Sequence, residues 1–212
     1  YPNHFDAERL LTFGKPYRVV DPGLAIKLFP SQYGTHYGIT AGIEMHRKLG
    51  GRKDIRRVRM VSPVMKYVNR PQPATGLDGK FSLQYTTSAA LLDGTVRIAT
   101  FTDERRFRTD MVALLDKFEL RQDEAIKGDF HSMYVEVEVE LEDGSRNKTI
   151  CKAPRGSWGA PMADGEHQAK LDDCLRYALP DATAAKLLAE LDRLETLDAR
   201  GISALIKLIA SS

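Results

Sequence analysis

Residues 132–142 read Ser-Met-Tyr-Val-Glu-Val-Glu-Val-Glu-Leu-Glu, and this stretch decides the kind of fold that the chain adopts. Valine or leucine at every second position alternates with glutamate, which is the two-residue period of a β-strand. We predict a strand that lies at the edge of a sheet or exposes one face, with glutamates that also discourage pairing with other chains. Same-face neighbours in a strand lie ~7 Å apart, which is too wide for these glutamates to share one metal ion.

Two further segments extend this strand into a sheet. Asp143-Gly144 is a hairpin turn signal, and residues 147–153 are predicted to return as a second strand. Residues 55–65 alternate loosely between apolar and basic side chains, which predicts a third strand. Because segments of helical periodicity surround these strands, we predict an α+β fold with a small antiparallel or mixed sheet and packed helices.

The predicted helices share apolar residues at intervals of three or four positions. They cover residues 6–14, 34–49, 78–94, 109–118, 166–179, 183–197 and 201–209. The helix in residues 78–94 is expected to be central and buried, with Asp78 as a candidate N-cap, and Thr109 is expected to cap the helix that ends at Phe118. In the helix that starts at Glu166, we expect an inward face of Ala169, Leu171, Leu175 and Ala178.

The composition is that of an ordinary globular protein. The 212 residues are 42% hydrophobic and 28% charged, enough for one large or two small domains. A net charge of +2 is too balanced to indicate binding to nucleic acid or a membrane surface. Two cysteines without a CxxC pair do not indicate a disulfide framework or a structural zinc site. With no signal peptide and no membrane-length apolar run, we expect a cytoplasmic protein, and Tyr1 in place of Met indicates a piece of a longer one.

The first candidate site is the stretch Ile-Lys-Leu-Phe-Pro-Ser-Gln-Tyr-Gly-Thr-His-Tyr in residues 26–37. Pro30 favours extended chain before it, and Ser31 and Thr35 are N-cap candidates for the helix that follows. A helix N-terminus offers N–H groups to a carboxylate or phosphate, beside which Lys27 and His36 add a charge and a titratable group. On these residues alone, an ordinary strand–turn–helix with an exposed lysine and a surface histidine is the simpler interpretation.

The second candidate site is Tyr-Val-Asn-Arg-Pro-Gln-Pro-Ala-Thr in residues 67–75. Its two prolines exclude a helix and keep the chain extended, so that Tyr67 and Arg70 point in fixed directions, as a binding site requires. The alternative is a rigid surface connector in which Arg70 pairs with a nearby acid. The residues themselves do not decide between the two.

Several motifs, taken in order, resemble the MmgE/PrpD family. They are Lys27-Leu-Phe-Pro-Ser with Thr35-His36, Tyr67-Val-Asn-Arg-Pro, Lys80-Phe-Ser-Leu-Gln-Tyr, Leu91-Leu-Asp-Gly, Phe101-Thr-Asp-Glu-Arg, Pro154-Arg-Gly and Ala169-Lys-Leu-Asp-Asp. The resemblance runs from about residue 21 to residue 179 and rests on order and spacing rather than on any one motif. The family includes 2-methylcitrate dehydratase, cis-aconitate decarboxylase and iminodisuccinate epimerase.

The resemblance implies a two-domain enzyme with a large all-helical domain, a smaller α+β lid and an active site between them. Residues 1–20 would end the helical domain and connect it to the lid, residues 21–160 would form the lid, and residues 161–212 would return to the helical domain. The N-terminal helical domain, with its catalytic Asp and His, is expected as a missing partner, and a homodimer is expected.

The implied activity is that of a cofactor-independent lyase of propionate metabolism, first a dehydratase of a small hydroxy-polycarboxylic acid such as 2-methylcitrate. An isomerase, epimerase or decarboxylase of the same family is the alternative, and a non-catalytic binding or assembly module is a third reading. The implied catalytic residues are Lys27, His36 and Tyr67, the implied ligands of a di- or tricarboxylate are Ser31, Gln32 and Arg70, and no metal is implied. Decarboxylases of the family carry a functional His where this chain has Gln32. The 212-residue chain is expected to be inactive alone.

Overall fold

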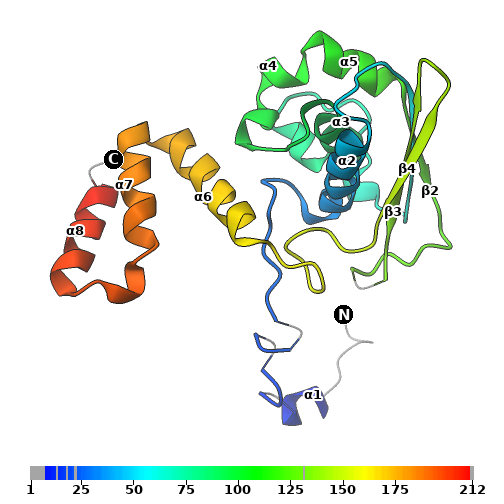
Figure 1. The fold of residues 1–212 in the computed structure, drawn as a ribbon. Coiled ribbons are helices and arrows are strands. Elements are labelled where there is room, and N and C mark those ends of the chain that lie inside the picture. The colour runs from blue at the N-terminus through cyan, green and yellow to red at the C-terminus, as the bar shows by residue number, and fades with distance from the viewer. Residues whose placement is uncertain (1–7, 13, 18, 22, 131, 211–212) are drawn as a thin grey trace.

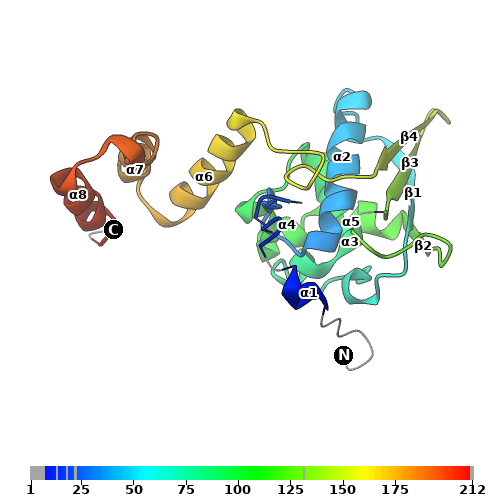
Figure 2. The same cartoon turned by 90° about the horizontal axis from the view of Figure 1, so that it is seen from below.

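A computed structural model describes residues 8–12, 14–17, 19–21, 23–130 and 132–210 (Figure 1). The strands are β1 (Ile55–Ser62), β2 (Phe118–Gln122), β3 (Val135–Leu141) and β4 (Arg146–Cys151). The α-helices are α1 (Glu8–Leu11), α2 (His36–Lys48), α3 (Leu83–Asp93), α4 (Asp103–Arg106), α5 (Thr109–Asp116), α6 (Asp164–Ala178), α7 (Asp181–Leu191) and α8 (Ala199–Ala210). Helices cover one face of the sheet, and α6 to α8 extend away from this body (Figures 1 and 2). The predicted α+β fold is confirmed.

The four strands form one mixed sheet in the order β2-β1-β3-β4. β1 and β2 run parallel, and the other two pairs are antiparallel. Because β3 lies between two strands, the predicted edge position is wrong. The alternative of one exposed face holds only in part: the valines and Leu141 are buried on one face, whereas on the other Glu136 and Glu138 are partly exposed and Glu140 is buried. The glutamates of β3 pair across the sheet with basic residues, as in Glu138 with Arg59 at 2.9 Å and Glu136 with Lys148 at 2.6 Å.

The edge strand β2 is the element that the sequence pattern did not predict. The helix expected over residues 109–118 ends at Asp116, and Phe118 begins the strand, paired with Val58 of β1. Lys117 fixes this change of direction, since its amine donates to the carbonyl of Ile55 at 2.7 Å. Phe118 and Leu120 then pack on the core from the edge of the sheet.

The predicted central helix is α3, and every residue from Leu83 to Leu92 is buried. Its N-cap is Ser82 rather than Asp78, because the Ser82 hydroxyl accepts from the N–H of Tyr85 at 2.9 Å. α2 packs on β3 and β4 with one side and on α3 with the other. Gly38 permits this approach, since a Cβ there would lie 2.3 Å from the Thr87 hydroxyl.

The two ends of the chain pack less closely than the body. The predicted helix over residues 6–14 is observed as the short α1, and Asp6, Ala7 and Phe13 of that prediction lie outside the described residues. In α6 no residue is buried, so the predicted inward face of that helix is wrong: Ala169 and Ala178 are exposed, and Leu171 and Leu175 are partly exposed. Among the described residues, no helix is both long and apolar enough to cross a bilayer.

Candidate functional site

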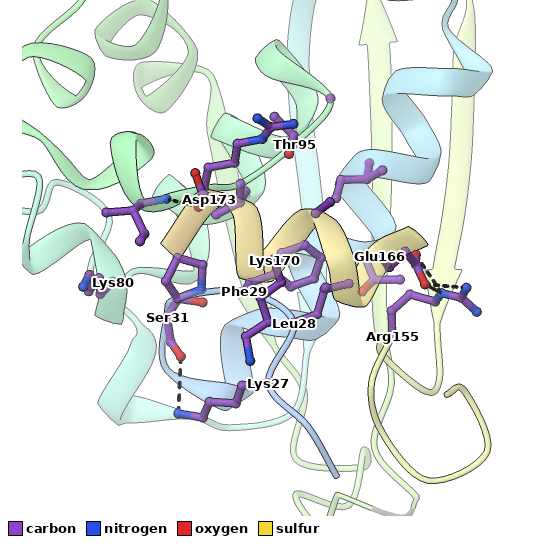
Figure 3. Close-up of a pocket in the computed structure, with 18 of the residues that line it drawn as sticks. Lys27, Leu28, Phe29, Ser31, Lys80, Thr95, Arg155, Glu166, Lys170 and Asp173 are labelled. Atoms are coloured by element: carbon purple, nitrogen blue, oxygen red, sulfur yellow. Dashed lines mark hydrogen bonds and ion pairs between the residues drawn. The ribbon is translucent and has the colours of Figure 1, made fainter. Parts of the chain in front are cut away.

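A groove of about 930 Å³ lies between the body and α6 (Figure 3). Its walls are residues 27–32, the outer face of α2, the loop of residues 94–98, and one face of α6. Three acidic residues line it, against six basic ones: Lys27, Arg47, Lys80, Arg97, Arg155 and Lys170. Leucine, isoleucine, valine and phenylalanine side chains form much of the remaining wall. An excess of cations over an apolar surface favours an anionic ligand.

Lys27 stands on an extended segment that the body holds at three points. The N–H of Ile26 donates to Gly156 at 2.8 Å, Phe29 is buried in the core, and the N–H of Gln32 donates to Lys80 at 3.0 Å. The exposed Lys27 amine donates to the carbonyl of Ser31 at 3.4 Å, and no acid among the described residues lies within ion-pair distance of it. Within the described ranges of the chain, Lys27 is therefore a cation without a carboxylate partner, and it stands on a fixed segment.

The turn after Pro30 is closed on itself, which corrects the prediction of free N–H donors there. The Gln32 side chain accepts from the N–H of Gly34, and the N–H of Thr35 donates to the Gln32 carbonyl at 3.0 Å. Thr35 is the N-cap residue of α2, as one of the two predicted candidates, but its side chain makes no capping hydrogen bond. The side-chain cap is made one turn earlier, where Gln32 caps the 3₁₀ turn Tyr33–Thr35. An anion at this turn would have to displace the Gln32 carboxamide.

Ser31 is buried beneath the turn, and its hydroxyl is already used. The Thr35 hydroxyl donates to the Gln32 carbonyl at 2.7 Å, so in the 2.8 Å contact between the two hydroxyls Ser31 is the donor. The contribution of Ser31 to the groove is therefore its backbone carbonyl, which accepts a hydrogen bond from the Lys27 amine. Its side chain has no proton left for a ligand.

The Tyr67 hydroxyl lies beside the turn that contains Gln32, although the two residues are far apart in sequence. A Cβ on Gly34 would lie 3.0 Å from the Tyr67 hydroxyl and 3.0 Å from the Gln32 side-chain oxygen, so both groups gather over this glycine. Tyr67 is 48% exposed, and burial of the rest raises its pKa further above its ordinary value, so the hydroxyl is a neutral donor at neutral pH. The side chain sits in a 3₁₀ turn, Lys66–Val68, and not in the extended chain that was predicted.

His36 lies beneath the turn and does not line the groove. Its ring is fully buried, with the rings of Phe29 and Tyr33 both 5.2 Å from it, centroid to centroid. Neither ring nitrogen has a hydrogen-bond partner of ordinary geometry among the residues that the structure describes. Burial lowers the pKa of His36 to about 4; the charge of Lys27 reinforces this shift, and the carbonyls of Ser31 and Phe29 oppose it. At neutral pH the imidazole is uncharged.

Arg70 is paired outside the groove. Its guanidinium donates to Asp78 and lies over the ring of Phe81 at 5.1 Å from the centroid. This is the arrangement of the rigid connector that the sequence left open as the alternative, with a nearby acid as the partner of Arg70. Of the sequence-predicted residues, the groove is lined by Lys27, Ser31 and Gln32, whereas Tyr67 reaches the same turn from outside it.

The groove also contains basic residues that were not proposed for it from the sequence. Lys80, Arg155 and Lys170 each stand inside a motif that carried the family resemblance, but no pattern within those motifs indicates that the three meet. Their motifs lie far apart in the chain and converge only through tertiary packing. Within the described part of the chain, no three His, Cys, Asp or Glu residues are arranged to hold a metal ion.

Comparison with known proteins agrees with the motifs. The model of the MmgE/PrpD C-terminal domain matches residues 29–196. A protein of Mus musculus named cis-aconitate decarboxylase is 27% identical over 182 residues, which cover 82% of this chain and 37% of that protein. The Homo sapiens protein of the same name is 27% identical over 181 residues, 82% of this chain and 38% of that protein. The chain therefore spans less than two fifths of the length of these relatives.

Proposed function

The chain belongs to the MmgE/PrpD family, and on that premise we propose that it is the C-terminal part of a lyase that acts on a small di- or tricarboxylate. The observation that carries the proposal is the Lys27 amine, exposed without an acid partner among the described residues, in a groove whose charged side chains are mostly basic. The Tyr67 hydroxyl, on the adjoining turn, adds a neutral donor. A cation in the groove and a neutral hydroxyl donor at the turn that follows it suit a carboxylate that gains charge during reaction.

The proposed first step is removal of a proton from the carbon next to a carboxylate. The electron pair of the broken C–H bond moves toward that carboxylate, which becomes enolate-like, and Lys27 stabilises the added negative charge. The base would come from the N-terminal helical domain, in which the resemblance places the catalytic Asp and His of the family. In a dehydration, the electron pair then forms a C=C bond as the C–O bond to the neighbouring hydroxyl breaks, and the hydroxyl takes up a proton and leaves as water.

Each of the other candidate residues is assigned a role that fits its position. Tyr67, with its raised pKa, would donate a hydrogen bond to the carboxylate or to the leaving hydroxyl. Ser31 would orient Lys27 through its carbonyl, and Gln32 would meet the substrate at the groove wall. His36 would act as a positioning residue, because its neutral ring fills the space under the turn. Arg70, bound to Asp78, would act only if that pair opened.

Dehydration of a 2-methylcitrate-like acid is the first candidate, and decarboxylation is the second because both relatives are named cis-aconitate decarboxylase. In a decarboxylation the C–C bond to one carboxyl group breaks, carbon dioxide leaves, and the electron pair takes up a proton at carbon. Both reactions need the same cation beside a developing carbanion. Gln32, where the resemblance gives decarboxylases a functional His, is the residue in this chain that favours dehydration.

A substrate panel on the complete gene product tests the proposal. We expect 2-methylcitrate or citrate to give an unsaturated acid, seen as rising ultraviolet absorbance, without release of carbon dioxide. Release of carbon dioxide from cis-aconitate would assign the second candidate instead. If none of these acids is converted, the lyase proposal is wrong for this protein.

Tyr67→Phe tests the role of the hydroxyl. It should lower kcat about a hundredfold with little change in the fold, because it removes one hydrogen-bond donor from the negative charge of the transition state.

A further inference from the structure

Helix α6 crosses the groove without being packed into it. Glu166, Lys170 and Asp173 follow one another at intervals of four and three residues, so they share one face of the helix, and all three line the groove. No residue of α6 is fully buried, and its Leu171 and Leu175 are only half-buried, so apolar packing constrains its position less than it does in the body. Polar contacts therefore carry more of the attachment of this helix.

Two polar contacts attach this face of α6 to the body, one on each side of Lys170. The Arg155 guanidinium donates to both carboxylate oxygens of Glu166, at distances between 2.6 and 3.1 Å. One helical turn beyond Lys170, the Asp173 carboxylate accepts from the N–H of Ile98 at 3.0 Å. Together these contacts set the rotation of α6, and Figure 3 shows Lys170 between them, on the side of the helix turned toward residues 27–31.

Lys170 has no acid partner among the described residues, and neither does Lys27 on the facing wall. The acidic residues nearest to Lys170 on its own helix face are the two that are already bound, Glu166 to Arg155 and Asp173 to Ile98. Two ammonium groups in one groove repel each other, and a ligand with two carboxylates removes that repulsion. A monocarboxylate can neutralise only one of them.

We infer that Lys170 is a second carboxylate-binding residue, so that the substrate is held between Lys27 on the body and Lys170 on α6. This inference rests on the proposed function and deepens it by naming the residue that takes the second carboxylate of the proposed di- or tricarboxylate. Lys27 takes the carboxylate next to the reacting carbon, and Lys170 takes a distant one. The Arg155–Glu166 contact is a positioning device for Lys170 and touches no substrate.

The test is steady-state kinetics and direct titration with cis-aconitate and citrate on the complete gene product. Lys170→Met should raise KM and Kd for these tricarboxylates about tenfold, the loss of one charge-assisted hydrogen bond, while kcat changes less. Lys170→Arg should restore most of the affinity because it keeps the charge. The matched control is Lys186→Met, an exposed lysine on α7 outside the groove, which should leave both constants unchanged.

The outcomes separate this inference from the proposed function. If Lys27→Met abolishes turnover while Lys170→Met binds both acids as the wild type does, the inference is wrong and the proposed function stands. If the wild-type protein neither binds nor converts any polycarboxylate, both are wrong.

Glu166→Gln tests the positioning role. It should raise KM in the wild-type background but add nothing to Lys170→Met, because its effect passes through Lys170. A purely structural effect of Glu166 would instead appear equally in both backgrounds, and that result would overturn the positioning role.

Discussion

The two walls of the groove are built in different ways. The wall of residues 27–32 is joined to the body by backbone hydrogen bonds and by Phe29 in the core, whereas α6 buries no residue and is attached by two polar contacts. Buried packing holds a side chain within a narrow range of positions, and exposed polar contacts hold it loosely. A reacting group belongs on the first kind of wall. A residue that selects among substrates can stand on the second.

The largest effect should come from the rigid wall. Lys27→Met removes the cation proposed to stabilise the enolate-like carboxylate, and we expect kcat to fall about a thousandfold. Because Lys27 is exposed, the melting temperature should not change. Kinetics on the complete gene product measures this, with Lys186→Met as the matched control. If kcat falls by only about a hundredfold or less, the cation that stabilises the reacting carboxylate does not lie on this wall.

The second-largest effect should be a loss of folding stability at low pH, caused by the buried His36 ring beneath that wall. The unfolded chain protonates His36 near its ordinary pKa of 6.5, but the folded chain protonates it only near 4. Stability from the neutral ring is therefore complete above pH 6.5 and is lost as pH falls toward 4, by on the order of 3 kcal/mol. Urea unfolding of the 212-residue chain at pH 7 and pH 4.5 measures it.

The control for this pH dependence replaces each of two histidines in turn. His36→Phe should flatten the change in unfolding free energy between the two pH values, whereas His167→Gln, at an exposed position on α6, should leave it in place. An equal pH dependence in the wild type and in His36→Phe would show that another group causes it.

Replacing two glycines by alanine compares the packing of the body with that of α6. A Cβ on Gly38 would lie 2.3 Å from the Thr87 hydroxyl and 2.9 Å from Leu83, so Gly38→Ala should destabilise the body by about 1–3 kcal/mol. No atom lies within 4 Å of the position for a Cβ on Gly165, so Gly165→Ala should stabilise by up to about 1 kcal/mol through helix propensity. Thermal melts of both variants check the contrast. Similar shifts in both would show that α6 is packed as closely as the body.

The smallest effect should come from the attachment of α6. Arg155 lowers the pKa of Glu166 below its ordinary value of 4.5, so the contact is complete above that pH and is lost as pH falls through the lowered pKa. A partly exposed pair contributes less than about 1 kcal/mol. Arg155→Met should therefore speed hydrogen exchange in α6 at pH 7 and leave α3 unchanged. Equal protection of α6 in both proteins would mean that other contacts hold it.

The sequence predicted the elements whose pattern is local and long. The alternation in β3, the turn at Asp143-Gly144 and the buried stripe of α3 all identified their elements. β2 was missed because its five residues directly follow a helix and are too few for their apolar spacing to distinguish a strand from a helix. Pairing with β1, which is not visible in the local sequence, makes this segment a strand. Ser82 was missed as a cap because Asp78 offers the same chemistry one turn earlier.

The candidate site was predictable only in part. Lys27 and Tyr67 were named from motifs, and the turn around Gly34 accounts for how Tyr67 comes to stand beside Gln32. That His36 would be buried and Arg70 paired depends on neighbours from other segments, which no local pattern encodes. Lys170 reaches the groove because Arg155 and the loop at Ile98 hold α6 there.

A crystal structure of the complete gene product with bound citrate would test the central claim most directly. We predict a citrate carboxylate within about 2.7–3.2 Å of the Lys27 amine, with the Tyr67 hydroxyl facing the same ligand. Citrate bound elsewhere, with the Lys27 amine and the Tyr67 hydroxyl on separate surfaces, would contradict it.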